Sequence, residues 1–311
     1  MQQDWLSHLL DMISVTGQLE VRCAFGGPWR VVYEHAATGE IPYHIVTAGK
    51  AILENPSDGT SQELHSGDIV LLPHGAAHVL HDGSGLAPLK PKQSASSSLI
   101  ISENDGVGAH LDMLCGRFLV PAPYHVLVER YLPERLVVST QSMPGGDELR
   151  SQISGLVNLI RFEAQVTHLG ARAMLNALST ALFTLTLRAA SSDGSDNLRG
   201  LLQLAADKRL APALFAILDS PSTNWTLPQL AEICLMSRST FIRQFEKKLG
   251  KSALDLLTDI RMGVASEELL RSGSSTEAIA EMAGYSSVAA FRRKFRERIG
   301  MTPGEWRKQA D

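Results

Sequence analysis

The sequence predicts an α+β multidomain protein, with a strand-rich, barrel-like domain at residues 1–145, a helical segment at 146–195 and an all-α domain at 196–311. Three observations support this prediction. Short apolar and alternating runs, separated by turn residues, fill most of the first domain. Apolar residues at three- and four-residue spacing follow it. The last ninety or so residues then repeat one helical pattern about fifty residues apart.

Composition predicts an ordinary globular protein of the cytoplasm. The chain has 311 residues, 44% of them apolar and 20% charged, which suffices for two or three separate cores. No uninterrupted apolar run is long enough to span a membrane, and the acidic, amphipathic N-terminus lacks the features of a secretory signal. Cys23, Cys115 and Cys234 are too few and too scattered for a disulfide framework or a zinc finger, which indicates a reducing compartment.

The first domain is predicted from its short apolar runs and the turn residues between them. An amphipathic helix is expected over residues 1–14, and strand-like pieces follow at roughly 8–12-residue spacing, which favours a sandwich or barrel. The residues from Asp82 to Ser98 are rich in Gly, Pro and Ser, and we expect a mobile loop there. The strand-like pieces are EVRCAF, WRVVYEH, YHIVTAGKAILEN, DIVLLPHG and LDMLCGRFLV.

Two long amphipathic helices are expected in the central segment, within DELRSQISGLVNLIRFEAQ and RAMLNALSTALFTLTLRAA. Their length suits dimerisation or a relay between domains. Ser191–Asn197 has the composition of a linker, and LAPALFAILDSP predicts one more helix before the repeat.

The C-terminal repeat matches position by position. Ala231 corresponds to Ala280 at an offset of 49, whereas Ser237 corresponds to Ser287 at an offset of 50. One extra residue therefore lies between these positions in the second copy. A helix interior cannot absorb it without rotating its apolar face, so a turn is expected there. Each copy is predicted to be a short helix, a turn, a serine-capped longer helix and a glycine stop, which is a helix-turn-helix unit.

The second helix of each unit is predicted to contact DNA. Such helices enter the major groove with their N-terminal residues toward the base edges. The i, i+4 pairs Phe241–Phe245 and Phe291–Phe295 mark the buried face, so the opposite face is free for bases and, further along, for phosphates. The predicted DNA-binding residues are Arg238, Ser239, Ile242, Arg243, Lys247, Val288, Ala289, Arg292, Arg293 and Lys294, and Lys248, Arg296 and Arg298 also suit phosphate neutralisation.

An apparent helix of about eighteen residues separates the copies and spans roughly 27 Å at about 1.5 Å per residue. This length is near the roughly 34 Å between successive major grooves on one face of DNA, so the pair is predicted to contact two adjacent grooves. Residues 221–311 have a net charge of +3 and residues 1–220 a net charge of −7, which favours a polyanion partner for the C-terminal end. The alternative is two amphipathic helical hairpins of an interaction domain.

The final ninety or so residues resemble the DNA-binding domain of the AraC/XylS family of transcriptional regulators. The matching motifs are Arg261-x3-Ala265-x3-Leu269-Leu270, Ile279-Ala280-Glu281, Gly284-Tyr285-Ser286-Ser287, Phe291-x-Arg293-x-Phe295 and Thr302-Pro303. Trp306, where Tyr is commoner, and Gly263, which should soften the linking helix by about 1 kcal/mol relative to Ala, depart from the pattern.

The resemblance to the AraC/XylS family implies partners and roles. It implies promoter DNA and RNA polymerase as partners, a homodimer, and activation more often than repression. It also implies base-facing positions for Ser239, Ile242, Arg243, Val288, Ala289 and Arg293.

GDIVLLPHGAAH matches the second motif of the cupin family through Gly67, Pro73, Gly75 and His78. A strand, a tight turn and a return strand would point His78 into a barrel. The first cupin motif, with its His-x-His pair, cannot be identified in the sequence. A metal site could draw on His44, His74, His78 or His81, but no metal or other cofactor is predicted. His44 and His78 are instead candidates for a ligand pocket.

VRCAFGGPW and LCGRF resemble the cupin-type sensor of one AraC subfamily, which includes a regulator responsive to reactive chlorine. Cys23 and Cys115 fall where that group has cysteines, and the resemblance implies thiol switches that form a disulfide or a sulfenic acid. The alternatives are a small-molecule ligand in the barrel and two cysteines that are simply buried. Cys234, matched by Ala283 in the second copy, is interpreted as packing.

The sequence-based hypothesis is a one-component regulator, not an enzyme, with no catalytic residues. Its cupin domain would receive a small molecule or an oxidant, and its paired helix-turn-helix units would bind promoter DNA. The alternative is a metal-dependent cupin enzyme of the dioxygenase or isomerase type, fused to a helical interaction domain.

Overall fold

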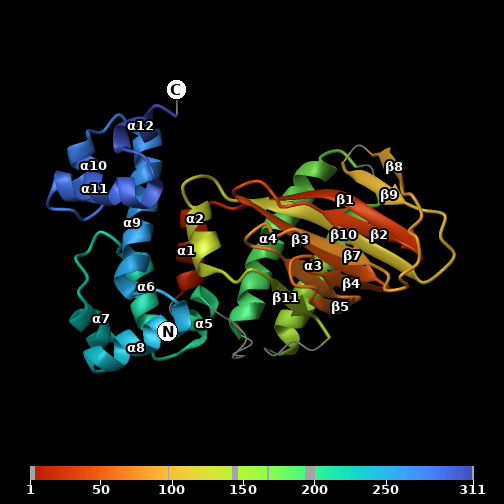
Figure 1. The fold of residues 1–311 in the computed structure, drawn as a ribbon, viewed down its shortest axis with the longest axis horizontal. Helices are drawn as coiled ribbons and strands as arrows, with labels where there is room; N and C mark the ends of the chain where they lie inside the picture. Colours follow the sequence, from red (N-terminus) through yellow and green to blue (C-terminus); the bar gives the residue numbers. More distant parts are fainter. Residues whose placement is uncertain (1–3, 97, 142–145, 167, 193–199, 310–311) are drawn as a thin grey trace. The chain divides into compact units, whose positions relative to one another are not determined.

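The structure is a computed structural model that describes residues 4–96, 98–141, 146–166, 168–192 and 200–309. The chain divides into two compact units, each described by itself below (Figure 1). The barrel unit comprises Val15–Val120 and Pro133–Asp193, and the helical unit comprises Met1–Ser14, Pro121–Leu132 and Gly194–Asp311. The helical unit thus includes two segments from the N-terminal half of the chain.

The barrel unit is built on two antiparallel-rich sheets. The seven-stranded sheet has the order β11-β6-β3-β10-β1-β9-β8, and the four-stranded sheet has the order β2-β7-β4-β5. The strands are β1 (Thr16–Gly26), β2 (Arg30–Tyr33), β3 (Glu40–Ala48), β4 (Lys50–Glu54), β5 (Ser61–His65), β6 (Asp68–Leu71), β7 (His78–His81), β8 (Lys92–Ala95), β9 (Ile100–Glu103), β10 (His110–Leu119) and β11 (Leu136–Ser139).

Alternating side chains of these strands form one apolar core. The rings of Phe25 and Trp29 pack within it at a separation of 5.6 Å and a tilt of 32°, and Cys23 and Cys115 are both buried among its members. The strand-like pieces expected from the sequence correspond to β1, β2, β3 with β4, β6 and β10. The predicted fold class, a strand-rich barrel domain followed by an all-helical domain, is confirmed.

One segment differs from its prediction. The stretch from Asp82 to Ser98, expected to be a loop, contains the edge strand β8. Every side chain of β8 is exposed, and its described pairing is with β9 alone. A strand held by backbone hydrogen bonds at a sheet edge needs no alternation of apolar residues, so this strand could not be recognised from its residues.

Two helices complete the barrel unit, α3 (Asp147–Glu163) and α4 (Ala171–Ser192). The α4 helix packs against the seven-stranded sheet: Tyr43 and Ser179 hydroxyls lie 2.8 Å apart, and the Gly17 amide donates to Thr180 Oγ1 at 2.8 Å. Among the described residues α4 is the one helix long and apolar enough by composition to cross a membrane, and 44% of that window is buried within the protein. Both expected central helices are therefore present.

The helical unit surrounds one long helix, α9. Its helices are α1 (Trp5–Ile13), α2 (His125–Tyr131), α5 (Leu201–Ala206), α6 (Ala211–Asp219), α7 (Leu227–Ile233), α8 (Arg238–Leu249), α9 (Ala253–Arg271), α10 (Thr276–Met282), α11 (Val288–Ile299) and α12 (Pro303–Arg307). The expected helices at the N-terminus, before the repeat and between the copies are α1, α6 and α9.

Candidate functional site

The two repeats fold as the duplicated sequence predicts. Ser237 accepts a hydrogen bond from the Thr240 amide at the start of α8, and Ser287 accepts one from the Ala290 amide at the start of α11. Both helices have twelve residues and end at a glycine in the left-handed region. Capping and termination are therefore the same in both copies, and the two second helices occupy equivalent places in their units.

The extra residue of the second copy lies in the turn. The Met236 amide donates to the Ala231 carbonyl at 2.9 Å, and the Tyr285 amide donates to the Ala280 carbonyl at 2.9 Å. These bonds still match at an offset of 49, so the insertion falls at Ser286, just before the serine cap. The prediction that a turn absorbs the insertion is confirmed.

The second helices of the two repeats, α8 and α11, are amphipathic as expected. Phe241, Phe245, Phe291 and Phe295 are fully buried. The predicted DNA-binding residues all keep exposed surface on the rest of each helix: Arg238, Ser239, Arg243, Lys247, Ala289, Arg292 and Arg293 are exposed, and Ile242, Val288 and Lys294 are half-buried.

The basic side chains of these helices fall into two groups. Among the described residues, no ion pair at 4.0 Å or less is recorded for Arg238, Arg243 or Arg293, so their guanidinium groups are available. Arg292 Nη2 lies 3.1 Å from Glu277 Oε1, and Lys294 Nζ lies 2.9 Å from Glu297 Oε2, both at the surface.

Lys248 and Arg298, also considered for phosphates, are engaged within the protein. Lys248 Nζ lies 3.2 Å from Asp207 Oδ2. Arg298 pairs with Asp255 and lies 3.4 Å from Asp259 Oδ1, which is buried. These two cations therefore stabilise the helical unit rather than face outward.

The linking helix α9 connects both copies within one unit. It has 19 residues, or about 28 Å at 1.5 Å per residue. Arg261 donates to the Pro221 and Thr223 carbonyls and stacks over the Tyr285 ring at 5.6 Å. Arg261 thereby connects the segment before α7 to the turn of the second helix-turn-helix repeat.

The unusual Gly263 of α9 has a packing reason. A Cβ at this position would lie 2.8 Å from Cε1 of Tyr124, whose hydroxyl donates to Glu267 Oε2 at 2.6 Å. Glycine therefore lets the ring of Tyr124 approach the helix backbone. Trp306, the other departure from the family pattern, donates its indole N–H to the Ser266 carbonyl of α9 at 2.9 Å.

A second group of candidate residues meets in the core of the barrel unit. His44 Nδ1 lies 3.1 Å from Cys115 Sγ, and His44 Nε2 lies 2.7 Å from His78 Nε2. Cys23 is buried in the same core as Cys115, at the diagonally neighbouring position across β1 and β10. The structure thus brings together all four sensor and ligand-pocket residues predicted from the sequence. We refer to these four with Tyr33 as the thiol–imidazole cluster.

The hydrogen bonds of this cluster define its tautomers. The Ala76 carbonyl can only accept, so His78 Nδ1–H donates to it at 2.9 Å, which leaves His78 Nε2 as the acceptor for His44 Nε2–H. His44 Nδ1 is then unprotonated and accepts a hydrogen bond from the Cys115 thiol. Two neutral imidazoles thus provide an acceptor for the thiol proton.

Electrostatics agree with these assignments. Burial, with a smaller effect of His78, lowers the pKa of His44 well below its usual value, and burial lowers the pKa of His78. Burial raises the pKa of Cys115 well above the usual value. The resting state is therefore a thiol beside neutral histidines.

Sequence reasoning missed Tyr33. Its ring stacks on His78 at 4.6 Å and 5°, and its hydroxyl donates to Cys115 Sγ at 3.6 Å. A tyrosine in a short alternating strand gives no signal of this role, because the partner strand cannot be identified from sequence alone.

The cluster does not have the geometry of a metal site. No group of three or more His, Cys, Asp or Glu side chains suited to a metal ion is found within the residues that the structure describes. The nitrogens of His44 point to Cys115 and His78 on opposite sides of its ring, so the three donors do not converge. His81 lies apart, with Nε2 3.4 Å from Glu54 Oε2.

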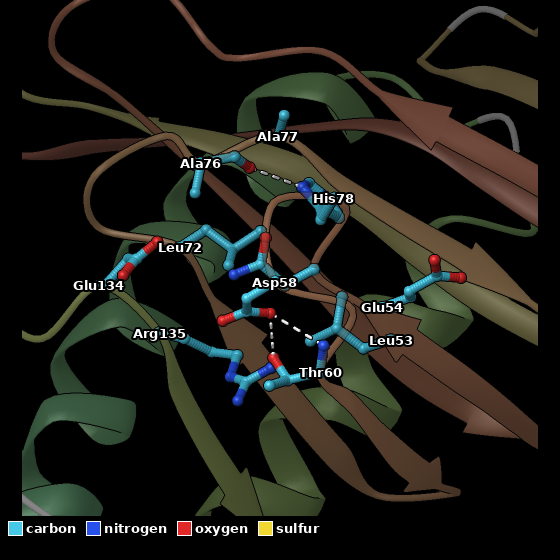
Figure 2. A pocket seen from close by; sticks show the side chains of 11 residues that line it. Leu53, Glu54, Asp58, Thr60, Leu72, Ala76, Ala77, His78, Glu134 and Arg135 are labelled. Atoms are coloured by element: carbon cyan, nitrogen blue, oxygen red, sulfur yellow. Dashed lines mark hydrogen bonds between the residues drawn. The ribbon is translucent and has the colours of Figure 1, made fainter.

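A small cavity opens beside His78 (Figure 2). Its volume is about 140 Å³. Asp58 accepts from the amide and hydroxyl of Thr60 at 2.8 and 2.7 Å, and these bonds, with a smaller effect of Arg135, lower the pKa of Asp58. The other lining residues are Leu53, Glu54, Asn55, Leu72, Ala76, Ala77 and Glu134.

Comparisons with known proteins agree with this geometry. Residues 4–192 match the family model described as "Cupin", and residues 230–309 match the one described as "Helix-turn-helix domain". The first range includes the strands and the thiol–imidazole cluster. The second includes α8, α9 and α11.

Full-length relatives are transcriptional regulators by name. An "Uncharacterized HTH-type transcriptional regulator" of Haemophilus influenzae is 31% identical over 98% of both chains. The "HTH-type transcriptional regulator MtrA" of Neisseria gonorrhoeae is 28% identical, and the "RCS-specific HTH-type transcriptional activator RclR" of Escherichia coli is 27% identical, again over 98% of both chains.

Fold, repeats and relatives define a DNA-binding transcriptional regulator with an N-terminal cupin domain and a C-terminal helix-turn-helix domain. Within that class the chain belongs to the AraC-type regulators, as its sequence motifs predict.

Proposed function

We propose that this regulator binds two adjacent major grooves of promoter DNA with α8 and α11, and that oxidation of the thiol–imidazole cluster is its signal. The observation behind the second part is the convergence of Cys23, Cys115, His44 and His78 in one buried network. These four residues lie far apart in the sequence, and the fold brings them together.

The proposed chemistry is disulfide formation by a hypohalous acid. Cys115 passes its proton to His44 Nδ1 and its sulfur attacks the chlorine of hypochlorous acid, releasing hydroxide. The Cys23 sulfur then displaces chloride and forms the disulfide. Two thiols and one hypochlorous acid thus give a disulfide, water, chloride and a proton. A relative named as specific for RCS supports this class of oxidant.

Strand register indicates how the disulfide would act. Cys115 lies opposite Val21, and Cys23 lies opposite Met113, so the two cysteines are diagonal neighbours across β1 and β10. Diagonal Cα atoms are about 7–8 Å apart, whereas disulfides need at most about 6.8 Å. Bond formation would therefore shift the strands. Since β10 ends at Leu119, just before the segment Pro121–Leu132, the shift would be passed along the chain.

The test is fluorescence anisotropy of the full-length protein on the DNA beside its own gene, before and after stoichiometric hypochlorite. We expect selective binding that changes on oxidation, with a 2 Da mass loss, and we expect Cys23→Ser and Cys115→Ser to abolish the change. Cys234→Ser is the matched control and keeps it. A double Cys23→Ser/Cys115→Ser protein that retains the full response would remove the redox proposal and leave the DNA-binding proposal intact.

The cavity beside His78 favours a second candidate, a small effector. Its volume of about 140 Å³ is close to that of the engineered cavity of about 150 Å³ that binds benzene, so the effector would have few heavy atoms. Ala77→Leu should fill the cavity. Loss of the cellular response in this variant, with the response kept in the cysteine double variant, would favour the effector.

Further family features enter this proposal. We propose a homodimer, contact with RNA polymerase, and activation of transcription. The partly exposed apolar side chains Leu159, Phe162 and Met174 of the central helices support a dimer surface there. Light scattering of the purified protein tests the dimer, and transcription in vitro with purified polymerase tests activation. The regulator names of its relatives support this function over the cupin-enzyme alternative.

A further inference from the structure

We infer that α8 and α11 present the same base-contacting side chains in exchanged order. The operator would then have two half-sites in which one guanine and one thymine exchange positions. This inference rests on the proposed contact of α8 and α11 with adjacent major grooves. It identifies the bases that those grooves would present.

The two helices can be aligned without gaps. Both have twelve residues, begin after a serine cap and end at a left-handed glycine, at an offset of 50. The first helical position is Arg238 in α8 and Val288 in α11, the fifth is Ile242 and Arg292, and the sixth is arginine in both. One arginine and one β-branched apolar residue therefore exchange places between the first and fifth positions.

The same exchange continues along each helix. Glu246 and Lys247 of α8 correspond to Arg296 and Glu297 of α11, so the order of charge is also reversed. These four residues are exposed. Glu297 pairs with Lys294 at 2.9 Å within α11, and the exposed charges of the two helices are therefore arranged differently.

The exchanged side chains are available to DNA. Arg238 is exposed, with no ion pair among the described residues. Ile242 and Val288 are half-buried, and Val288 packs in part against the core of the second copy, so each offers its outer surface to DNA. Arg292 pairs with Glu277, but both side chains are more than half exposed, at 58% and 60%. An exposed pair of this kind contributes little and can be given up for a base contact. The position matching Glu277 in the first copy is Pro228, so this ion pair has no counterpart there.

The known contacts between side chains and bases predict the operator bases from these positions. Arginine makes a bidentate contact with guanine O6 and N7, and a branched apolar side chain packs against the thymine methyl group. In order along the helix, α8 would contact guanine, thymine and guanine through Arg238, Ile242 and Arg243. The α11 helix would contact thymine, guanine and guanine through Val288, Arg292 and Arg293.

The first experiment is selection of binding sites from a random duplex library with the full-length protein. Single 7-deazaguanine and uracil substitutions in the selected site then remove guanine N7 or the thymine methyl group. We expect two half-sites that share one guanine and differ by exchange at two other positions. Each bidentate arginine contact should account for a loss of roughly tenfold or more in affinity.

An exchange variant gives the sharper result. Arg238→Val/Ile242→Arg makes α8 resemble α11 at these positions, and it should select two half-sites of the α11 type. Val288→Arg/Arg292→Val should select two of the α8 type. Lys247→Ala is the control, because loss of a phosphate contact weakens all sequences alike. Circular dichroism checks that each variant is folded.

Three outcomes are distinguishable. Exchanged half-sites that follow the variants support the inference. Two identical half-sites from the native protein, or exchange variants that select the native site, overturn it while leaving the proposed function in place. Failure to select any site overturns both.

Discussion

The two helix-turn-helix turns place different residue types in the same left-handed conformation. Leu235 has φ of 53°, in the left-handed region, and its side chain is 93% exposed, whereas the matching Gly284 has φ of 77°. A left-handed conformation costs a non-glycine residue about 1–2 kcal/mol, and no burial of Leu235 offsets that cost. We expect Leu235→Gly to raise the free energy of unfolding by up to about 1 kcal/mol, because glycine loses more entropy on folding but removes the strain. Urea denaturation measures the change.

Gly284→Ala is the opposite case. A Cβ at Gly284 would contact the Ser222 carbonyl oxygen, so this variant should lose stability. Stabilisation by Gly284→Ala, or destabilisation by Leu235→Gly, would contradict the role given to φ.

The buried histidines predict a pH dependence. Burial lowers the pKa of both His44 and His78 from about 6.5, their usual value in an unfolded chain. Below that pH the unfolded state binds more protons than the folded state, so the barrel unit loses stability as the pH falls. The loss is at most about 1.4 kcal/mol per pH unit for each histidine. The expected result is a lower unfolding midpoint at pH 5.5 than at pH 7.5, with a smaller difference in His78→Gln.

Trp29 provides the readout, because it lies in the core of the barrel unit. Replacing Trp5, Trp225 and Trp306 with Phe leaves it as the sole tryptophan reporter. His65→Gln, at an exposed position on β5, is the control for the loss of one histidine outside the core. An equal pH dependence in His78→Gln and the parent would contradict the titration of the buried pair.

At the residue scale, the sequence can indicate candidates wherever a residue type carries its own chemistry. Free cysteines and histidines can be nominated from the sequence, and the second cupin motif correctly places His78 at the start of a return strand. Their meeting point depends on strand pairing, since Cys115 lies opposite His44 through the register of β10 and β3. A register of this kind is set by packing over the whole sheet.

At the scale of elements, α2 is joined to α9 by a buried carboxylate. Asp259 accepts from the Tyr131 hydroxyl at 2.6 Å and pairs with Arg130 at 3.0 Å and Arg298 at 3.4 Å. Removing one member of a buried pair leaves the others unsatisfied. We expect Asp259→Asn to lower the free energy of unfolding of the helical unit by about 3 kcal/mol, measured by urea denaturation.

Asp255→Asn is the matched control. Asp255 also pairs with Arg298 but is 38% exposed, so its loss should cost about 1 kcal/mol or less. Equal losses in the two variants would show that burial of Asp259 is not what matters.

Elements were predictable where their own residues are periodic. The duplicated helices combine caps, glycine stops and paired phenylalanines, and these signals are local. The α2 helix and strand β11 are short, at 7 and 4 residues, and too short for a period to be recognised. What holds α2 in place is Asp259, which lies 128 residues from Tyr131 in the sequence.

At the scale of the whole molecule, the two units are interleaved along the chain. The sequence predicts a division at residue 195, within a stretch outside the described residues, and that division remains a prediction. The helical unit also includes Met1–Ser14 and Pro121–Leu132. His8 packs edge-on against Phe215 at 5.1 Å, and Tyr124 packs on Gly263. A C-terminal piece cut at the predicted boundary would lack both segments.

This arrangement predicts the behaviour of a 196–311 fragment. The fragment lacks α2, so Asp259 would keep Arg298 and lose its other two partners, Tyr131 and Arg130. The surface of α9 that Tyr124 covers would also be exposed. We expect the fragment to unfold at a lower urea concentration than the helical unit of the full chain. Asp259→Asn should then cost less stability in the fragment than in the full chain, because two of the partners are already gone. Equal stability of fragment and full chain, with equal effects of Asp259→Asn, would mean that α1 and α2 rest on the helical unit without stabilising it.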